Sequence, residues 1–125
     1  MPSDNAIWDR FLIAYPDYFN AVSYDVRVGE GIQPAGEIDP AISEMAVLLT
    51  QRRIDVLGER QNKLFIIEVK QDPGVSILGQ LLGYETLLRL QDPRIKDTEP
   101  IAIVNRIFPD LEKILAAHNI KFFVV

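Results

Sequence analysis

Residues 64–70 read Leu-Phe-Ile-Ile-Glu-Val-Lys, and this stretch decides the fold. Its four leading apolar residues predict a strand that is buried on both faces in the middle of a sheet. Glu68 and Lys70 stand at the end of that strand, and Asp55 lies one short strand upstream. Burying a lone carboxylate or ammonium is costly unless the group is paired or bound to a metal ion. The sequence therefore predicts a cluster of mutually compensated charges inside the sheet.

The composition is that of an ordinary soluble domain. The chain has 125 residues, of which 48% are apolar and 25% charged, so we expect residues 1–125 to form one domain with its own core. The absence of cysteine excludes disulfides and thiolate zinc sites. No apolar run approaches the roughly 20 residues that span a bilayer, and the N-terminus lacks the pattern of a signal peptide. We therefore expect a cytoplasmic protein without membrane contact.

The net charge of −5 argues against a simple nucleic-acid-binding surface. Proteins that hold a phosphate backbone normally present a basic surface to it. A cluster of carboxylates that recruits Mg²⁺ would itself lower the net charge, so the acidic balance does not exclude an enzyme that acts on nucleic acid.

Hydrophobic periodicity and turn residues divide the chain into alternating helices and strands. We expect helices over 4–15, 40–49, 75–90 and 109–118, and strands over 21–28, 52–58, 63–70, 101–104 and 120–125. This order predicts an α/β fold in which a central mixed sheet is flanked by helices.

Two helix starts and one strand carry clear local signals. Ser3 is the expected N-cap of the first helix, and Asp39-Pro40 predicts the start of the second, with an extended stretch over 46–50 as the alternative. In the strand over 21–28, apolar residues alternate with polar ones, which predicts that they share one buried face. These apolar residues are Val22, Tyr24, Val26 and Val28.

The connection between the two central strands predicts which residues face each other. If Gln61-Asn62 forms a two-residue turn, Arg60 lies opposite Lys63, and the same register places Asp55 opposite Glu68. Opposed residues share a face, with Cβ atoms about 4.5–5.5 Å apart. Lys70 shares that face with Glu68, because residues two apart in a strand point the same way. A turn of another length would shift this register.

Two carboxylates at such a short separation repel each other unless they are protonated or bridged by a cation. Oxygen ligands select Mg²⁺, Mn²⁺ or Ca²⁺, and the carbonyl of Val69 is a natural third ligand beside Asp55 and Glu68. Lys70 can stabilise charge on a phosphate or orient a metal-bound water. This set suits metal-assisted hydrolysis of a phosphodiester. The simpler alternative is a Glu68–Lys70 ion pair at a strand end, with Asp55 exposed on an edge strand.

Gln80 and Tyr84 are four residues apart on the next helix, so they lie on one face of it. Gly79 and Gly83 beside them predict a close approach of the sheet or of a ligand. The alternative for Gln80 and Tyr84 is a solvated glutamine and a core tyrosine with its hydroxyl at the surface.

Taken in order, Ile54-Asp55, Glu68-Val69-Lys70 and Gln80-Leu-Leu-Gly-Tyr84 resemble the motifs of the PD-(D/E)xK nuclease superfamily. The glutamine–tyrosine element is similar to that of its RecB-like and NucS-type branches, which resemble Holliday-junction resolvases. The resemblance covers roughly residues 4–105 and implies a restriction-endonuclease-like αβββαβ core. Here Ile54 stands where the family often has proline.

The resemblance also implies a role for each site residue. Asp55 and Glu68 would hold Mg²⁺, with Mn²⁺ as a substitute, and Lys70 would assist the attacking water. Gln80 and Tyr84 would position the phosphate or the lysine. A further metal-binding acid on the first helix is expected at Asp9, with rival positions elsewhere in the chain. These rivals are Asp25, Glu37 and Glu44.

The expected function is that of a Mg²⁺-dependent endodeoxyribonuclease that hydrolyses DNA. The alternative is a non-catalytic nuclease-fold module that binds nucleic acid or protein. The basic DNA-binding domain of NucS-type enzymes is absent, so we expect a separate DNA-binding partner or a homodimer, which could pair through the strand over 122–125. Arg52 and Arg53 are interpreted as solvated strand-end charges, with phosphate contact as the alternative. His118 is expected to cap the last helix, and Trp8 to lie in the core.

Overall fold

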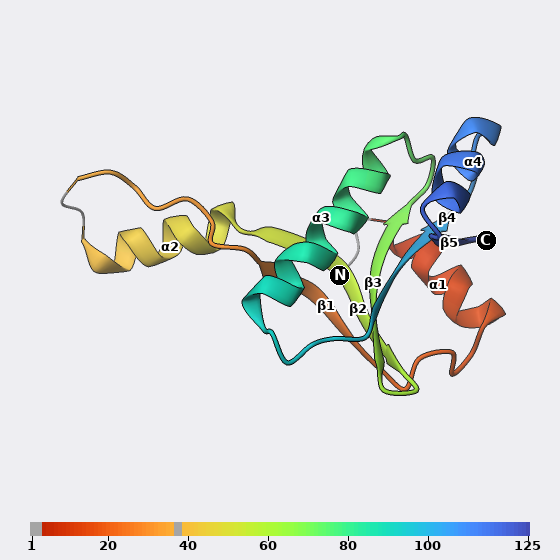
Figure 1. Cartoon of the computed structure of the whole chain (residues 1–125), viewed down its shortest axis with the longest axis horizontal. Helices are drawn as coiled ribbons and strands as arrows, with labels where there is room; N and C mark the ends of the chain where they lie inside the picture. Colours follow the sequence, from red (N-terminus) through yellow and green to blue (C-terminus); the bar gives the residue numbers. More distant parts are fainter. Residues whose placement is uncertain (1–3, 37–38) are drawn as a thin grey trace.

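The computed structural model describes residues 4–36 and 39–125. In this part of the chain four helices and five strands alternate (Figure 1). The helices are α1 (Asn5–Ala14), α2 (Pro40–Thr50), α3 (Ser76–Gln91) and α4 (Pro109–Ala117). The strands are β1 (Ala21–Val28), β2 (Arg52–Arg60), β3 (Lys63–Lys70), β4 (Thr98–Val104) and β5 (Lys121–Val124).

The strands form one mixed sheet in the order β1-β2-β3-β4-β5. The β1–β2 and β2–β3 pairs are antiparallel, whereas β3–β4 and β4–β5 are parallel. Each parallel pair is joined through a helix, as parallel pairing requires. The predicted α/β class, the mixed sheet and the order of elements are confirmed.

β3 is the central strand, and it contributes to a core on each face of the sheet. Ile66 packs with side chains of α3 and α4, while Ile67 packs with side chains of α1 on the opposite face. Figure 1 shows α1 and α3 on either side of β3. The five residues from Phe65 to Val69 are all buried, which confirms that the stretch that decides the fold is covered on both faces.

The helix ends follow local signals. α1 begins at Asn5 with Asp4 in the N-cap position, and the expected cap Ser3 lies outside the described residues. α1 presents Trp8 to the core as predicted, with 1% of its surface exposed. At the C-cap of α4, the exposed His118 places Nδ1 2.9 Å from the carbonyl oxygen of Ile114, in agreement with a capping role.

α2 projects away from the sheet. It starts as predicted, because the side chain of Asp39 accepts a hydrogen bond from the N–H of Ala41 (2.8 Å). It continues to Thr50, so the alternative of an extended stretch over 46–50 is wrong. None of its residues is buried, and Leu49 is 75% exposed. Figure 1 shows α2 reaching out to the left of the other helices.

β1 changes faces at Asp25. Tyr24 lies on the α1 side, where its hydroxyl accepts a hydrogen bond from Trp8 Nε1 (3.0 Å), whereas Val26 and Val28 pack beneath α3. Residues two apart in a regular strand share a face. The change coincides with the left-handed backbone of Asp25, whose φ is 53°. The prediction that these apolar residues share one buried face is therefore wrong, because the chain turns over at Asp25.

Among the described residues, the structure contains no helix long and apolar enough to cross a bilayer.

Candidate functional site

The β2–β3 hairpin sets the register of the candidate site. Gln61 and Asn62 both have positive φ, 53° and 64°, as a two-residue hairpin turn requires. Arg60 lies opposite Lys63, and the pairing continues in the same register to Val56 opposite Ile67. The predicted turn is confirmed, and Asp55 and Glu68 come next in line.

At Asp55 and Glu68 the carboxylates replace the main-chain acceptors of the sheet. The N–H of Asp55 donates to Glu68 Oε1 (3.3 Å), and the N–H of Val69 donates to Asp55 Oδ2 (3.1 Å). Each acid is thereby fixed by the backbone of the opposite strand. The two side chains meet, as the register predicts.

Asp25 lies on the other side of Asp55. The β1–β2 register passes from Tyr24–Val56 to Val26–Ile54, which places Asp25 and Asp55 across from each other. Acidic residues therefore stand side by side on three neighbouring strands, and the rival acid Asp25 lies next to the pair.

Glu68 is buried, with only 3% of its surface exposed. Burial raises the pKa of Glu68 to about 8, and the charge and side-chain hydrogen bond of Asp55 act in the same direction. The charge of Lys70 opposes them by lowering the pKa of Glu68. Without a metal ion beside it, Glu68 therefore holds a proton at neutral pH.

The simpler alternative of a Glu68–Lys70 ion pair does not describe this arrangement. The ion pairs found among the described residues do not include these two side chains. Nor is Asp55 on an edge strand, because β2 lies between β1 and β3. The half-buried Asp55 instead accepts a backbone N–H of the opposite strand, and the buried Glu68 accepts such a bond and holds its proton at neutral pH.

α3 brings Gln80 and Tyr84 to the carboxylate pair. Burial raises the pKa of the Tyr84 hydroxyl, and the charges of Glu68 and Asp55 raise it further. A side-chain hydrogen bond with Gln80 acts in the opposite direction on this pKa. Gln80 Oε1 is buried and has no hydrogen-bond partner. A buried acceptor without a donor marks a place where a water, an ammonium or a ligand can donate to it.

The expected close approach at Gly79 and Gly83 is wrong for the sheet. A Cβ atom added at either glycine would meet nothing within 4 Å. The surface of α3 at Gly79 and Gly83, next to Gln80 and Tyr84, therefore carries no side chain. This leaves room for a ligand along the helix.

The structure does not bring Asp9 to the pair. α1 turns Ile7, Trp8 and Phe11 toward the sheet, so helical geometry leaves Asp9 exposed. Within residues 4–36 and 39–125, no three acidic or imidazole side chains are grouped so that they could hold one metal ion. Asp9, the predicted third acid, is therefore not part of a three-residue metal-binding group among the described residues.

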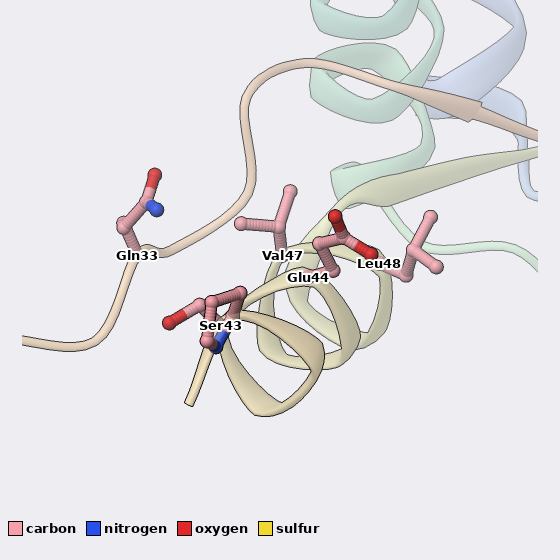
Figure 2. Close-up of a pocket in the computed structure, with 6 residues that line it drawn as sticks. Gln33, Ser43, Glu44, Val47 and Leu48 are labelled. Carbon is pink, nitrogen blue, oxygen red and sulfur yellow. The ribbon is translucent and has the colours of Figure 1, made fainter. Parts of the chain in front are cut away.

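The rival Glu44 is also remote from the pair, because it lies on the projecting α2. There it lines a hollow of about 670 Å³ between the loop after β1 and the helix. Figure 2 shows Gln33 from the loop and Ser43, Glu44, Val47 and Leu48 from α2 around this hollow. The other rival, Glu37, lies outside the described residues.

Asp4 is an acid of the α1 end that the sequence prediction missed. Its Oδ2 accepts a hydrogen bond from the N–H of Gln71 (3.3 Å), the residue directly after Lys70. Asp4 therefore stands at the end of β3 where the carboxylate pair lies. The signal available in the sequence was its N-cap residue type, since aspartate is a preferred N-cap.

The donor set fits a hard divalent cation. Asp55 and Glu68 offer carboxylate oxygens that lie next to each other, and the carbonyl of Val69 is adjacent in the chain. Mg²⁺ is commonly held by one or two carboxylates and keeps waters and substrate phosphate for its other positions. The chemistry of the pair therefore suits Mg²⁺ or Mn²⁺.

No protein-family model and no curated protein matches the chain. Solved structures do match it. A crystal structure of the protein of unknown function AF1548 has a TM-score of 0.57 and 16% identity, and the match covers 93% of this chain and 53% of that one. A repair endonuclease from Pyrococcus abyssi has a TM-score of 0.57 and 14% identity, with coverage of 100% and 48%.

The fold is restriction-endonuclease-like. The predicted fold class is thereby confirmed, with α1, the β1–β3 strands, α3 and β4 in the expected order. The chain spans about half the length of the solved structures it matches. At sequence identities of 16% and 14%, the similarity to these two structures concerns the fold alone.

Proposed function

We propose that this chain is a Mg²⁺-dependent nuclease of the PD-(D/E)xK superfamily that hydrolyses phosphodiester bonds of DNA. The observation that carries the proposal is the pair of reciprocal bonds that hold Asp55 and Glu68 together inside the sheet. The match to a repair endonuclease supports it, because that protein has a similar fold and cuts nucleic acid according to its name.

Asp55 and Glu68, with the carbonyl of Val69, would hold Mg²⁺ or its substitute Mn²⁺. When bound, the ion supplies positive charge for the phosphate oxygens and lowers the pKa of a bound water. Lys70 would orient the attacking water, and this role is supported by its position on the same face as Glu68, half-buried beside it. Gln80 Oε1, which has no hydrogen-bond partner, would accept a hydrogen bond from that water or from the Lys70 ammonium, and Tyr84 holds the Gln80 side chain.

The proposal is tested by incubating the protein with plasmid, linear and branched DNA in Mg²⁺ or Mn²⁺. Asp55→Asn and Lys70→Ala are expected to lower the cleavage rate by about 100-fold or more, because each removes a group at the reacting centre. Asp9→Asn is the matched control, since Asp9 is exposed on α1, and it should cleave like the unmodified protein. Cleavage that persists in both site variants would argue for a contaminant and against this site.

The second candidate is a nuclease-fold module that binds nucleic acid or protein without hydrolysis. The net charge of −5 favours protein over nucleic acid as the partner of such a module, because an acidic surface repels a phosphate backbone. Calorimetry with Mn²⁺ separates the two candidates. A scaffold without a metal site would take up no Mn²⁺ that depends on Asp55 and Glu68.

A further inference from the structure

Arg52 and Arg53 begin β2 and point to opposite faces of the sheet. Arg52 lies opposite Val28, and both Val28 and Ile54 pack in the core beneath α3. Since opposed residues and residues two apart share a face, Arg52 lies on the α3 side. Arg53 lies opposite Arg27, on the other side of the same two strands.

The start of β2 lies against the second half of α3. The N–H of Gly29, the residue after Val28, donates to the side chain of Gln91 (3.2 Å), and Leu87 is the first side chain that a Cβ at Gly29 would meet. Tyr84 lies one turn earlier on α3. The positive charge of Arg52 lowers the pKa of the Tyr84 hydroxyl, while the charges of Glu68 and Asp55 raise it. Arg52 and the carboxylate pair therefore act on the same hydroxyl group.

Arg52 is exposed and available to a ligand. Within the part of the chain that the structure describes, the ion pairs found do not include it, whereas Arg94 binds Asp92 and Arg106 lies 3.6 Å from Asp72. A guanidinium can bind two phosphate oxygens at once. An anionic strand that approaches Asp55 and Glu68 is repelled by the negative charge that the pair carries, so a cation beside the pair favours its binding.

We propose that Arg52 is a substrate-binding residue of this site, and that its guanidinium binds a backbone phosphate of a nucleic-acid strand next to the phosphate that reaches Asp55 and Glu68. This inference rests on the proposed function. The nucleic-acid strand would pass along the surface of α3 at Gly79 and Gly83, where an added Cβ atom would meet nothing within 4 Å. Because a phosphate contact reads no base, the contribution of Arg52 is the same for every sequence.

The test compares Arg52→Ala with Arg53→Ala, which removes the same side chain from the opposite face one residue away. Fluorescence anisotropy measures the binding of a labelled DNA oligonucleotide in Ca²⁺ at several salt concentrations. Arg52→Ala should raise Kd by about three- to tenfold and reduce the salt dependence by about one phosphate contact. Arg52→Lys should restore part of the affinity, since lysine keeps the positive charge but cannot bind two phosphate oxygens at once as a guanidinium does. Arg53→Ala should stay within about twofold of the unmodified protein.

Two measurements exclude a structural cause. Arg52→Ala should keep its unfolding temperature and its Mn²⁺ affinity, because the exposed side chain supports neither the core nor the carboxylate pair. If the alanine variant does not fold, Arg52→Gln replaces it in the same comparison. Binding by the Arg52 variants that equals that of the unmodified protein, or an equal loss in Arg53→Ala, overturns the assignment.

The outcomes for Arg52 and for the nuclease proposal are distinct. Arg52-dependent binding without cleavage in Mg²⁺ or Mn²⁺ would refute hydrolysis and keep the binding role of Arg52. If the protein cleaves DNA and Arg52→Ala has an unchanged KM, the role of Arg52 is refuted and the nuclease proposal stands. A chain that neither binds nor cleaves DNA would refute both.

Discussion

At the scale of single residues, Asp55 and Glu68 combine a structural and a chemical role. Each side chain accepts a backbone N–H from the opposite strand, at the point where the main-chain pairing of β2 and β3 ends. These bonds hold Glu68 in a buried position beside Asp55. Burial, and after it the charge of Asp55, raises the pKa of Glu68, which is the cost of placing an acid there.

The stability of the metal-free protein should therefore fall as pH rises. The pKa of Glu68 is raised from 4.5 to about 8 in the folded state, so between these values the folded state binds more protons than the unfolded one. The stabilisation is complete below about pH 4.5 and is lost as pH passes through about 8. One pKa unit corresponds to about 1.4 kcal/mol, which makes the expected loss several kcal/mol.

Urea unfolding in EDTA at pH 5.5 and 8.5 measures this loss as a change in the free energy of unfolding. Glu68→Gln cannot ionise at this position, so its stability should change much less between the two pH values. An equal change in both proteins would show that other groups cause the pH dependence.

A divalent cation should reverse the loss at high pH. Mn²⁺ bound between Asp55 and Glu68 would compensate the charge of the ionised Glu68, and a ligand at about 100 times its Kd stabilises a fold by about 2.7 kcal/mol. Thermal unfolding at pH 8 with and without Mn²⁺ measures the effect. Asp55→Asn should abolish it and Asp9→Asn should leave it intact, whereas stabilisation of all three proteins alike would mean that Mn²⁺ binds elsewhere.

The sequence could predict the central pair but not the helix-borne acid. Asp55 and Glu68 follow from the two-residue turn at Gln61-Asn62, since a hairpin register depends only on local geometry. Which acid of α1 lies near the site depends instead on which residues of this helix are buried in the core. Trp8 and Phe11 turn toward the sheet, so Asp9 faces outward and Asp4 reaches the end of β3.

At the scale of elements, α2 and α3 show that an apolar sequence does not by itself determine burial. Both helices are rich in leucine, but α3 packs on the sheet while α2 projects from it. β1 gives a similar lesson, because its regular alternation is interrupted by the backbone of Asp25. The helix and strand identities could be predicted from local patterns, whereas the position of α2 and the turn in β1 depend on contacts between distant segments.

Substitutions of leucine in these two helices should differ in their effect on folding. Leu81 in α3 is 0% exposed, so Leu81→Ala should lower the free energy of unfolding by about 2–5 kcal/mol. Leu49 in α2 is 75% exposed, so Leu49→Ala should change it by less than about 0.5 kcal/mol. Chemical denaturation measures both. A large loss in Leu49→Ala would mean that α2 is packed in solution against something that stabilises the fold.

At the scale of the whole molecule, the net charge and the site chemistry act against each other. The chain carries a net charge of −5, yet the proposed substrate is a polyanion. The negative charge of the pair that would hold the metal ion is part of this repulsion when no ion is bound. A cation at the pair is therefore expected to serve binding as well as catalysis.

This leads to a prediction with opposite signs for binding and for cleavage. The double variant Asp55→Asn, Glu68→Gln removes up to two negative charges from the path of the DNA, so its DNA affinity in EDTA at low salt should exceed that of the unmodified protein by about two- to tenfold. Its cleavage in Mg²⁺ should be lost, because the oxygens that hold the ion are replaced by neutral amides. Anisotropy and gel assays measure the two effects on the same preparation, and Asp9→Asn controls for a loss of charge away from the pair. A lower DNA affinity in the double variant would mean that Asp55 and Glu68 take part in binding the DNA. Their charge would then not repel it.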